Sequence, residues 1–104
     1  MSNPEVETPA LEVVEDTQLS HVFDPASLAR SIEAILMVVD EPVTELVLAQ
    51  IIEAPTEEIV LALNNLAAKY EAEQRGFELR QVSGGWRYYS HPDMAPLVEK
   101  FVLD

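Results

Sequence analysis

Residues 77–90 read FELRQVSGGWRYYS, in which apolar and polar side chains alternate on both sides of a Gly84-Gly85 pair. Alternation with a period of two is typical of a strand with one buried face, and a Gly-Gly pair between two such segments predicts a β-hairpin. Trp86 and Tyr88 share one face of the second strand. We expect both rings to pack against the rest of the domain and not to form a stacking platform for bases.

Three helices are predicted before this hairpin. Apolar side chains recur every three or four positions over residues 25–40 and again over residues 56–73, which is the pattern of a helix with one buried face. Between them, residues 44–52 predict a short helix that is apolar on almost every side. We expect Gly76 to end the third helix in a left-handed conformation. The predicted core residues of the two long helices are Leu28, Ile32, Ile35, Leu36, Val39, Ile59, Leu63, Leu66 and Tyr70.

A short last helix is predicted after the hairpin. Pro92 and Pro96 delimit its start, and because Pro96 would clash inside an established helix, residues 92–95 are expected to form a separate turn. The order of helix, helix, turn, helix and hairpin is the plan of a winged helix-turn-helix. The predicted fold class is therefore α+β, mainly α: three helices, a β-hairpin wing and a C-terminal helix.

The first 24 residues differ in composition from the rest of the chain. They hold six acidic side chains and no Lys or Arg, which predicts a solvated, disordered tail over residues 1–24 and one winged-helix domain over residues 25–104.

The chain has no Cys, so disulfides and thiolate metal sites are excluded. It has no basic signal region and no apolar run long enough for a bilayer. We expect a cytoplasmic protein with no membrane partner.

The charge balance argues against nucleic acid as the partner. The chain has 19 Asp and Glu against 6 Lys and Arg, for a formal net charge of −13. The third helix, which reads DNA in many winged helices, carries several Glu residues and Lys69 alone. Affinity for DNA comes largely from basic contacts to phosphates, so sequence-specific DNA binding is not expected. The alternative, a winged-helix transcriptional regulator, would use the wing residues Arg75, Arg80 and Arg87 as weak candidate DNA contacts.

No pattern of residues indicates catalysis. His91 precedes a proline and is expected to be a surface turn residue, and no metalloprotease, phosphate-loop or calcium-loop motif occurs. The acidic side chains are scattered instead of paired in an apolar setting. We therefore predict that the protein is not an enzyme and that it has no catalytic residue, metal site or cofactor.

The apolar side chains outnumber the positions that a small core offers. Several on one domain of this size indicate a contact with another protein, although the last helix and the tail are an alternative cover for them. The candidate interface residues, chosen by their expected exposure, are Met37, Leu48, Ile51, Leu61, Ala68 and Ala72.

Two long stretches carry a resemblance to a known family. IEAILMVVDEPVT at residues 32–44 and LAAKYEAEQRGFELRQVSGGWRYYSHPDMAPLVEKF at residues 66–101 resemble the N-terminal winged-helix domain of bacterial segregation and condensation protein B. The resemblance covers residues 31–102, nearly all of the predicted domain.

This resemblance implies a non-catalytic subunit of the bacterial condensin, the SMC–kleisin complex of chromosome condensation and segregation. It implies a homodimer that binds the kleisin, segregation and condensation protein A, and through it the SMC ATPase, in the cytoplasm and associated with the nucleoid. Because members of the family carry two winged-helix domains and this chain holds one, dimerisation is the activity best matched to it. An adaptor of another complex is a further alternative.

Overall fold

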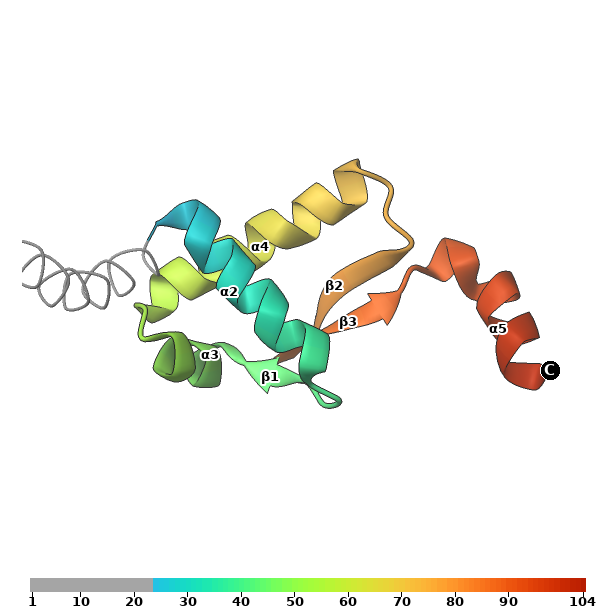
Figure 1. Cartoon of the computed structure of the whole chain (residues 1–104), viewed down its shortest axis with the longest axis horizontal. Helices are drawn as coiled ribbons and strands as arrows, with labels where there is room; N and C mark the ends of the chain where they lie inside the picture. The colour runs from blue at the N-terminus through green and yellow to red at the C-terminus, as the bar shows by residue number, and fades with distance from the viewer. Residues whose placement is uncertain (1–23) are drawn as a thin grey trace, which may run out of the picture.

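The computed structural model describes residues 24–104, so the tail predicted over residues 1–24 lies outside the described residues except for Asp24. Three helices pack beside a small sheet, and a last helix projects from the end of the hairpin (Figure 1). This arrangement confirms the predicted winged-helix fold. The elements are α2 (Pro25–Val38), β1 (Val43–Thr44), α3 (Glu45–Ile52), α4 (Thr56–Ala72), β2 (Phe77–Val82), β3 (Gly85–Ser90), η1 (Pro92–Met94) and α5 (Ala95–Leu103).

The sheet has three antiparallel strands in the order β1-β3-β2. The predicted hairpin pairs Phe77 with Ser90 at its open end and Val82 with Gly85 at its turn. β1 was not predicted. It has two residues and pairs Val43 with Trp86, and a strand this short has no periodicity that a sequence can reveal.

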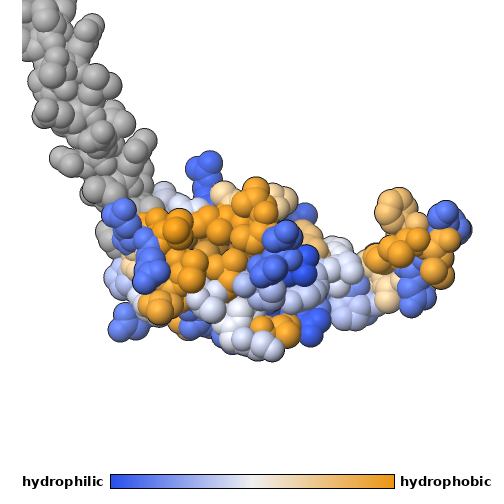
Figure 2. Space-filling model, turned by 90° about the horizontal axis from the view of Figure 1, so that it is seen from below, coloured by the Kyte–Doolittle hydropathy of each residue, from blue (hydrophilic) through white to orange (hydrophobic). Residues whose placement is uncertain are grey.

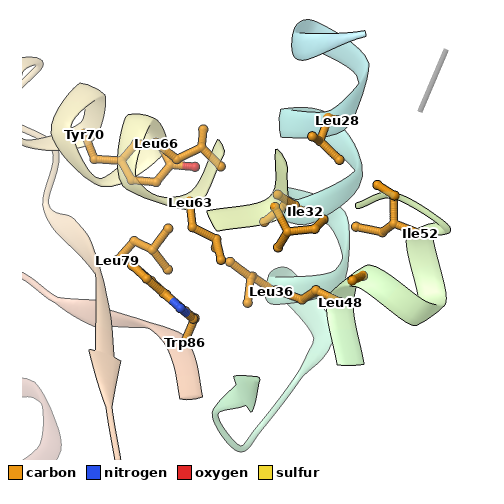
Figure 3. Packing of buried hydrophobic residues seen from close by; sticks show 13 residues of the cluster. Leu28, Ile32, Leu36, Leu48, Ile52, Leu63, Leu66, Tyr70, Leu79 and Trp86 are labelled. Carbon is orange, nitrogen blue, oxygen red and sulfur yellow. The ribbon is translucent and has the colours of Figure 1, made fainter. Parts of the chain in front are cut away.

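The core lies where α2, α3 and α4 meet the inner face of the hairpin (Figure 3). Trp86 and Leu79 close it on the side of the sheet, as the alternation of the hairpin predicts. Of the predicted helical core, Ile35 and Val39 are only partly buried. The buried apolar residues are Leu28, Ile32, Leu36, Leu48, Ala49, Ile52, Ala54, Ile59, Leu63, Leu66, Tyr70, Leu79 and Trp86.

The ends of the short and long helices are held by local bonds. Thr44 directly precedes α3 as its N-cap, and its Oγ1 accepts a hydrogen bond from the Val47 amide at 3.2 Å, which satisfies one of the free donors of the first turn. After α4 the left-handed residue is Gln74, with φ of 55°. The expectation for Gly76 is therefore wrong, because the chain turns two residues earlier, where the Arg75 amide already donates to the Tyr70 carbonyl.

The wing is fastened to α3 by a side-chain bond. The Trp86 indole N–H donates to Glu45 Oε2 at 3.0 Å, and Gln81 donates to the same oxygen at 3.4 Å. A buried indole needs such an acceptor. The hairpin is thereby held against the first turn of the helix that follows β1.

Replacing Gly85 by alanine is expected to lower the free energy of unfolding by about 1–3 kcal/mol, the usual cost of overpacking. A Cβ at Gly85 would lie 2.5 Å from Pro42 Cβ and 3.0 Å from the Pro42 carbonyl carbon, where β1 approaches β3. Gly76→Ala is the matched control, since nothing lies within 4 Å of a Cβ there. Urea unfolding of both variants tests this, and equal stabilities would contradict it.

Candidate protein-interaction surface

Large apolar side chains are exposed over much of the described surface. Figure 2 shows a broad apolar area on the body of the domain and a separate apolar lobe at α5. Single exposed apolar residues are normal, but a gathered set on a small domain marks a contact site. The set is Met37, Val38, Leu46, Val47, Ile51, Leu61, Phe77, Met94, Leu97, Val98, Phe101, Val102 and Leu103.

The predicted interface residues do not all lie on the surface. Met37, Ile51 and Leu61 are 73%, 66% and 58% exposed, and Ala68 and Ala72 are exposed as well. Leu48 is fully buried, so its expected exposure is wrong. The reason is that α3 is apolar on nearly every side, and only the packing against its neighbours decides which side faces inward.

The last helix does not cover these residues. No residue of α5 is buried, and the helix lies beyond the open end of the hairpin, away from α2, α3 and α4 (Figure 1). The alternative in which the C-terminal helix hides the surplus apolar surface is therefore wrong within the described chain. Leu97, Val98 and Phe101 lie on this helix and are not among the predicted interface residues.

An apolar groove runs between α2 and α4. It has a volume of about 280 Å³ and is lined mainly by aliphatic side chains, with Leu61 on one wall and Leu28 at its base. Lys69 and Glu58 lie at its edges. A groove of this kind accepts apolar side chains of a partner and offers one group of each charge for orientation.

A second cavity, here called the aromatic cavity, is lined by Glu33, Met37, Tyr70, Phe77 and Tyr88 and has a volume of about 440 Å³. Its three rings meet edge to face or tilted, with centroids 4.9–5.8 Å apart, which is the spacing that aromatic pairs prefer. The cavity lies between α2, α4 and the inner face of the hairpin, so its lining residues are distant from one another in the sequence.

A polar network closes the floor of the aromatic cavity. The Tyr70 hydroxyl donates to Glu33 Oε2 at 2.5 Å, and it lies 3.0 Å from the Tyr88 hydroxyl. Burial raises the pKa of Tyr70 far above its ordinary value, and the hydrogen bonds to Glu33 and Tyr88 raise it further. Burial also raises the pKa of Tyr88. Both phenols therefore stay neutral, and Glu33 contributes an acceptor and a negative charge to the cavity.

The wing arginines are engaged with neighbouring side chains. Arg75 Nε lies 3.0 Å from Glu73 Oε1, and Arg80 Nη1 lies 3.5 Å from Glu78 Oε2. The guanidinium groups of Arg80 and Arg87 lie 4.9 and 5.8 Å from the centre of the Tyr89 ring. Such exposed pairs are weak. Glu73 and Glu78 offset the charge of Arg75 and Arg80, whereas Arg87 lies near a neutral ring and keeps its charge.

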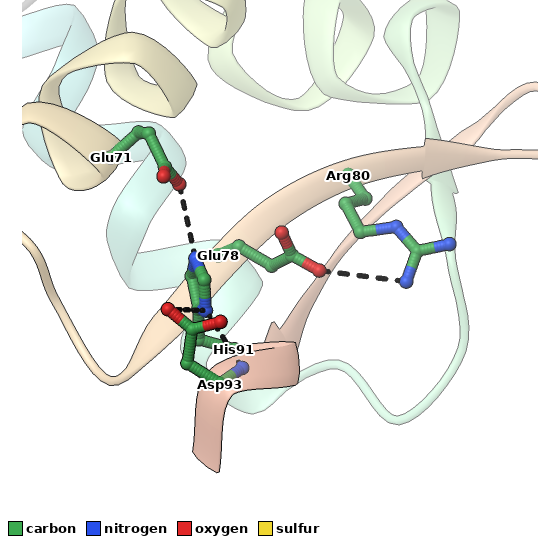
Figure 4. A network of polar contacts seen from close by, with 5 residues as sticks. All are labelled: Glu71, Glu78, Arg80, His91 and Asp93. Atoms are coloured by element: carbon green, nitrogen blue, oxygen red, sulfur yellow. Dashed lines mark hydrogen bonds and ion pairs between the residues drawn. The ribbon is translucent and has the colours of Figure 1, made fainter. Parts of the chain in front are cut away.

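His91 occupies the junction between β3 and η1 (Figure 4). Its Nδ1 accepts from the Asp93 amide at 3.1 Å, so the proton of the neutral ring lies on Nε2, which is 3.2 Å from Glu71 Oε1. Ligand atoms of Glu71, Glu78 and His91 lie within 4.8 Å of one another. Because Nε2–H offers no lone pair in this tautomer, the cluster is suited to fixing the junction and poorly suited to holding a metal.

The expectation of His91 as a plain surface turn residue is therefore wrong. Its side chain is 17% exposed, and it caps η1 while it contacts α4. The contact with Glu71 spans 20 positions of sequence, and no local motif indicates it.

Within residues 24–104, no helix combines the length and the apolar character that crossing a membrane requires.

Comparison with known proteins gives one consistent result. The family model of the segregation and condensation complex subunit ScpB matches residues 30–104. Segregation and condensation protein B of Desulforamulus reducens is 34% identical over 70 residues, or 67% of this chain and 39% of that protein. The protein of the same name from Halalkalibacterium halodurans is 35% identical over 77 residues, or 73% of this chain and 39% of that protein. The chain thus spans little more than a third of the length of these relatives.

Solved structures share the fold. ScpB from Mycobacterium tuberculosis has a TM-score of 0.75 at 40% identity, over 78% of this chain and 51% of that chain. A conserved hypothetical protein from Chlorobium tepidum has a TM-score of 0.66 at 33% identity, over 74% of this chain and 49% of that one. A dimer of an ScpB N-terminal domain complexed with an ScpA peptide has a TM-score of 0.66, over 71% of this chain and 93% of that one. At 23% identity, that last likeness concerns the fold alone.

Proposed function

The chain belongs to the family of the segregation and condensation complex subunit ScpB, and on that premise we propose that it is a non-catalytic subunit of the bacterial SMC–kleisin complex. It acts by forming a homodimer and by binding the kleisin, segregation and condensation protein A, which links it to the SMC ATPase. Residues 25–104 form the unit that carries these contacts. Such a subunit works in the cytoplasm, at the nucleoid.

The observation that carries this proposal is the apolar surface left open on an acidic winged helix. Exposed apolar side chains occupy the body of the domain and α5, whereas the wing arginines are engaged by Glu73, Glu78 and Tyr89. Apolar surface stabilises a complex when a protein covers it and contributes little to a contact with phosphates. The surface therefore favours a polypeptide as the partner.

The residues proposed for these contacts are the exposed members of the predicted set. Met37 lies at the aromatic cavity, Ile51 on the outer side of α3, and Leu61 in the groove between α2 and α4. Ala68 and Ala72 are exposed farther along α4 and let a partner approach its backbone closely. The groove at Leu61 and the cavity at Met37 share no lining residue, which suits a subunit with more than one partner.

Sedimentation of the chain alone is expected to show a species of twice the monomer mass of 11.6 kDa. Addition of a kleisin fragment is expected to give a heavier complex. A chain that remains monomeric over a wide range of concentration, and that binds no kleisin fragment, would contradict the proposed function.

Leu61→Glu is expected to weaken at least one of the two associations by about tenfold, or about 1.4 kcal/mol, because it places a charge in an apolar groove that a partner covers. Ala34→Glu is the matched control, since Ala34 is exposed on α2 beside Ser27, Arg30 and Ser31. Sedimentation measures self-association and fluorescence anisotropy measures kleisin binding. Unchanged values for a folded Leu61→Glu variant would contradict the role of the groove.

Binding to DNA, the activity of a transcriptional regulator, is separable by its response to salt. A contact with phosphates weakens steeply as salt rises, because it depends on counterion release. Association of two copies of an acidic chain is expected to hold or strengthen, since salt screens the repulsion between them. Titration with random duplex at low ionic strength is expected to show no tight binding, and a tight, salt-sensitive complex would favour the regulator.

A further inference from the structure

α5 carries an apolar stripe, and no residue of this helix is buried. Leu97 and Val98 lie four and three positions before Phe101 on a helix of nine residues, so both flank its ring on one side of the helix. Phe101 is 82% exposed and Leu97 is 65% exposed. Figure 2 shows this helix as a lobe whose surface is mostly apolar. An exposed aromatic ring of this kind is the sort of side chain that anchors an interface.

The junction before α5 holds the helix away from its own domain. The His91 amide donates to the Gly76 carbonyl at 2.8 Å, and the Met94 amide donates to the His91 carbonyl at 2.8 Å. The His91 ring contacts Glu71 on α4 and accepts from the Asp93 amide (Figure 4). These bonds set the direction of α5 with respect to both the hairpin and α4.

The aromatic cavity matches the stripe in size and charge. Its volume of about 440 Å³ is enough for a phenylalanine side chain with aliphatic neighbours, and Met37 stands 73% exposed at its edge. The cavity contains the Glu33 carboxylate, and Lys100 and Asp104 lie beside Phe101 at the end of α5, where Lys100 is one of the six basic residues of the chain. A lysine next to the inserted ring would meet an acidic group at the receiving site.

We propose that Phe101 on α5 of one copy docks in the aromatic cavity of a second copy, and that the second copy returns the same contact. This assignment rests on the homodimer proposed above and names its surface. In such an exchange each copy contributes one stripe and one cavity, so the buried area is twice that of a one-way contact. Specific interfaces bury a total of about 1,200 Å² or more. It also closes under two-fold symmetry, as most homodimers do.

A second copy is favoured over the chain's own domain as the occupant. The cavity lies next to the end of β3 from which α5 departs, because Phe77 pairs with Ser90. The bonds of His91 nevertheless send the helix outward, where a neighbouring molecule can receive it. If α5 folded back onto its own domain, the contact between His91 and Glu71 and the hydrogen bond from the Asp93 amide to His91 would be broken.

The test is the dimer dissociation constant of the whole chain, measured by sedimentation with retention of fold checked by circular dichroism. Phe101→Asp removes the inserted ring, and Met37→Asp places a charge at the edge of the cavity beside Glu33. Both positions are exposed, so both variants are expected to fold. Each is expected to raise the dissociation constant at least tenfold. The control Gln50→Asp, at an exposed polar residue on α3 outside the proposed contacts, is expected to leave it unchanged.

Mixing the two variants separates an exchange from other interfaces. A Met37→Asp copy keeps an intact stripe and a Phe101→Asp copy keeps an intact cavity, so their heterodimer has one intact contact whereas either homodimer has none. The mixture is therefore expected to associate more strongly than either variant alone.

The possible failures are distinguishable. A wild-type chain that stays monomeric would count against the proposed homodimer itself. A wild-type dimer that tolerates Phe101→Asp, or that Gln50→Asp disrupts as strongly, would overturn the assigned surface and leave the homodimer standing. Variants that dissociate alone and show no recovery on mixing would overturn the exchange.

Discussion

Replacing Leu48 by glutamate is expected to unfold the domain at neutral pH. Leu48 is fully buried between α3 and the long helices, and the described residues within the core offer no basic partner for a carboxylate there. Burying an unpaired charge costs several kcal/mol, which is comparable to the whole stability of a small domain, about 5–15 kcal/mol. Circular dichroism at 25 °C and urea unfolding measure the loss.

Ile51→Glu is the matched control for this prediction. It makes the same kind of change three positions along the same helix, at a side chain that is 66% exposed. Its free energy of unfolding is expected to stay within about 0.5 kcal/mol of the wild type, as is usual for surface changes. A folded Leu48→Glu variant as stable as Ile51→Glu would show that Leu48 does not face the core.

The stability of the domain is expected to fall as the pH rises above 10, the ordinary pKa of tyrosine. In the folded state burial and the bond to Glu33 raise the pKa of Tyr70, so this phenol keeps its proton while the unfolded chain loses it. The unfolded state then binds fewer protons, and the free energy of unfolding falls with pH. Below pH 10 the contribution is fully present, and it is lost as the pH rises toward the folded-state pKa.

Tyr70→Phe isolates this contribution. The variant keeps the ring and the net charge of the chain, so self-repulsion at high pH is similar in both proteins. The wild type is expected to lose up to about 1.4 kcal/mol more stability per pH unit than the variant between pH 10 and pH 12. Urea unfolding at a series of pH values measures both slopes. Equal slopes would mean that the Tyr70 hydroxyl is not buried against Glu33.

Helices α2 and α4 and the hairpin could be predicted from the sequence alone. Their apolar side chains recur with a clear period, and Pro42, Pro55 and the Gly84-Gly85 pair interrupt those patterns at the element ends. The same information yielded the buried side of α4, from Ile59 to Tyr70, because large apolar side chains recur there every three or four positions. The family resemblance over residues 31–102 agrees with the family model at residues 30–104.

The interaction surface could be predicted only in part. Met37 and Leu61 were found because each lies off the apolar stripe of its helix. Leu48 and Ile51 were chosen together on α3, and only Ile51 is exposed. The helix that contains it has no polar side from which an orientation can be read. The aromatic cavity was missed, because Glu33, Tyr70 and Tyr88 are brought together only by the packing of α2 and α4 on the sheet.

The sequence by itself determined the order and type of the elements and the acidic character of the chain, since periodicity, proline and glycine act locally and charge is a count. The tertiary structure alone decided which side of α3 is buried and that His91 contacts Glu71 where the chain leaves the sheet for α5. Those outcomes depend on contacts between residues up to 41 positions apart, as between Glu45 and Trp86. Contacts at that range leave no periodic trace in a single sequence, because their partners are chosen by the packing of whole elements.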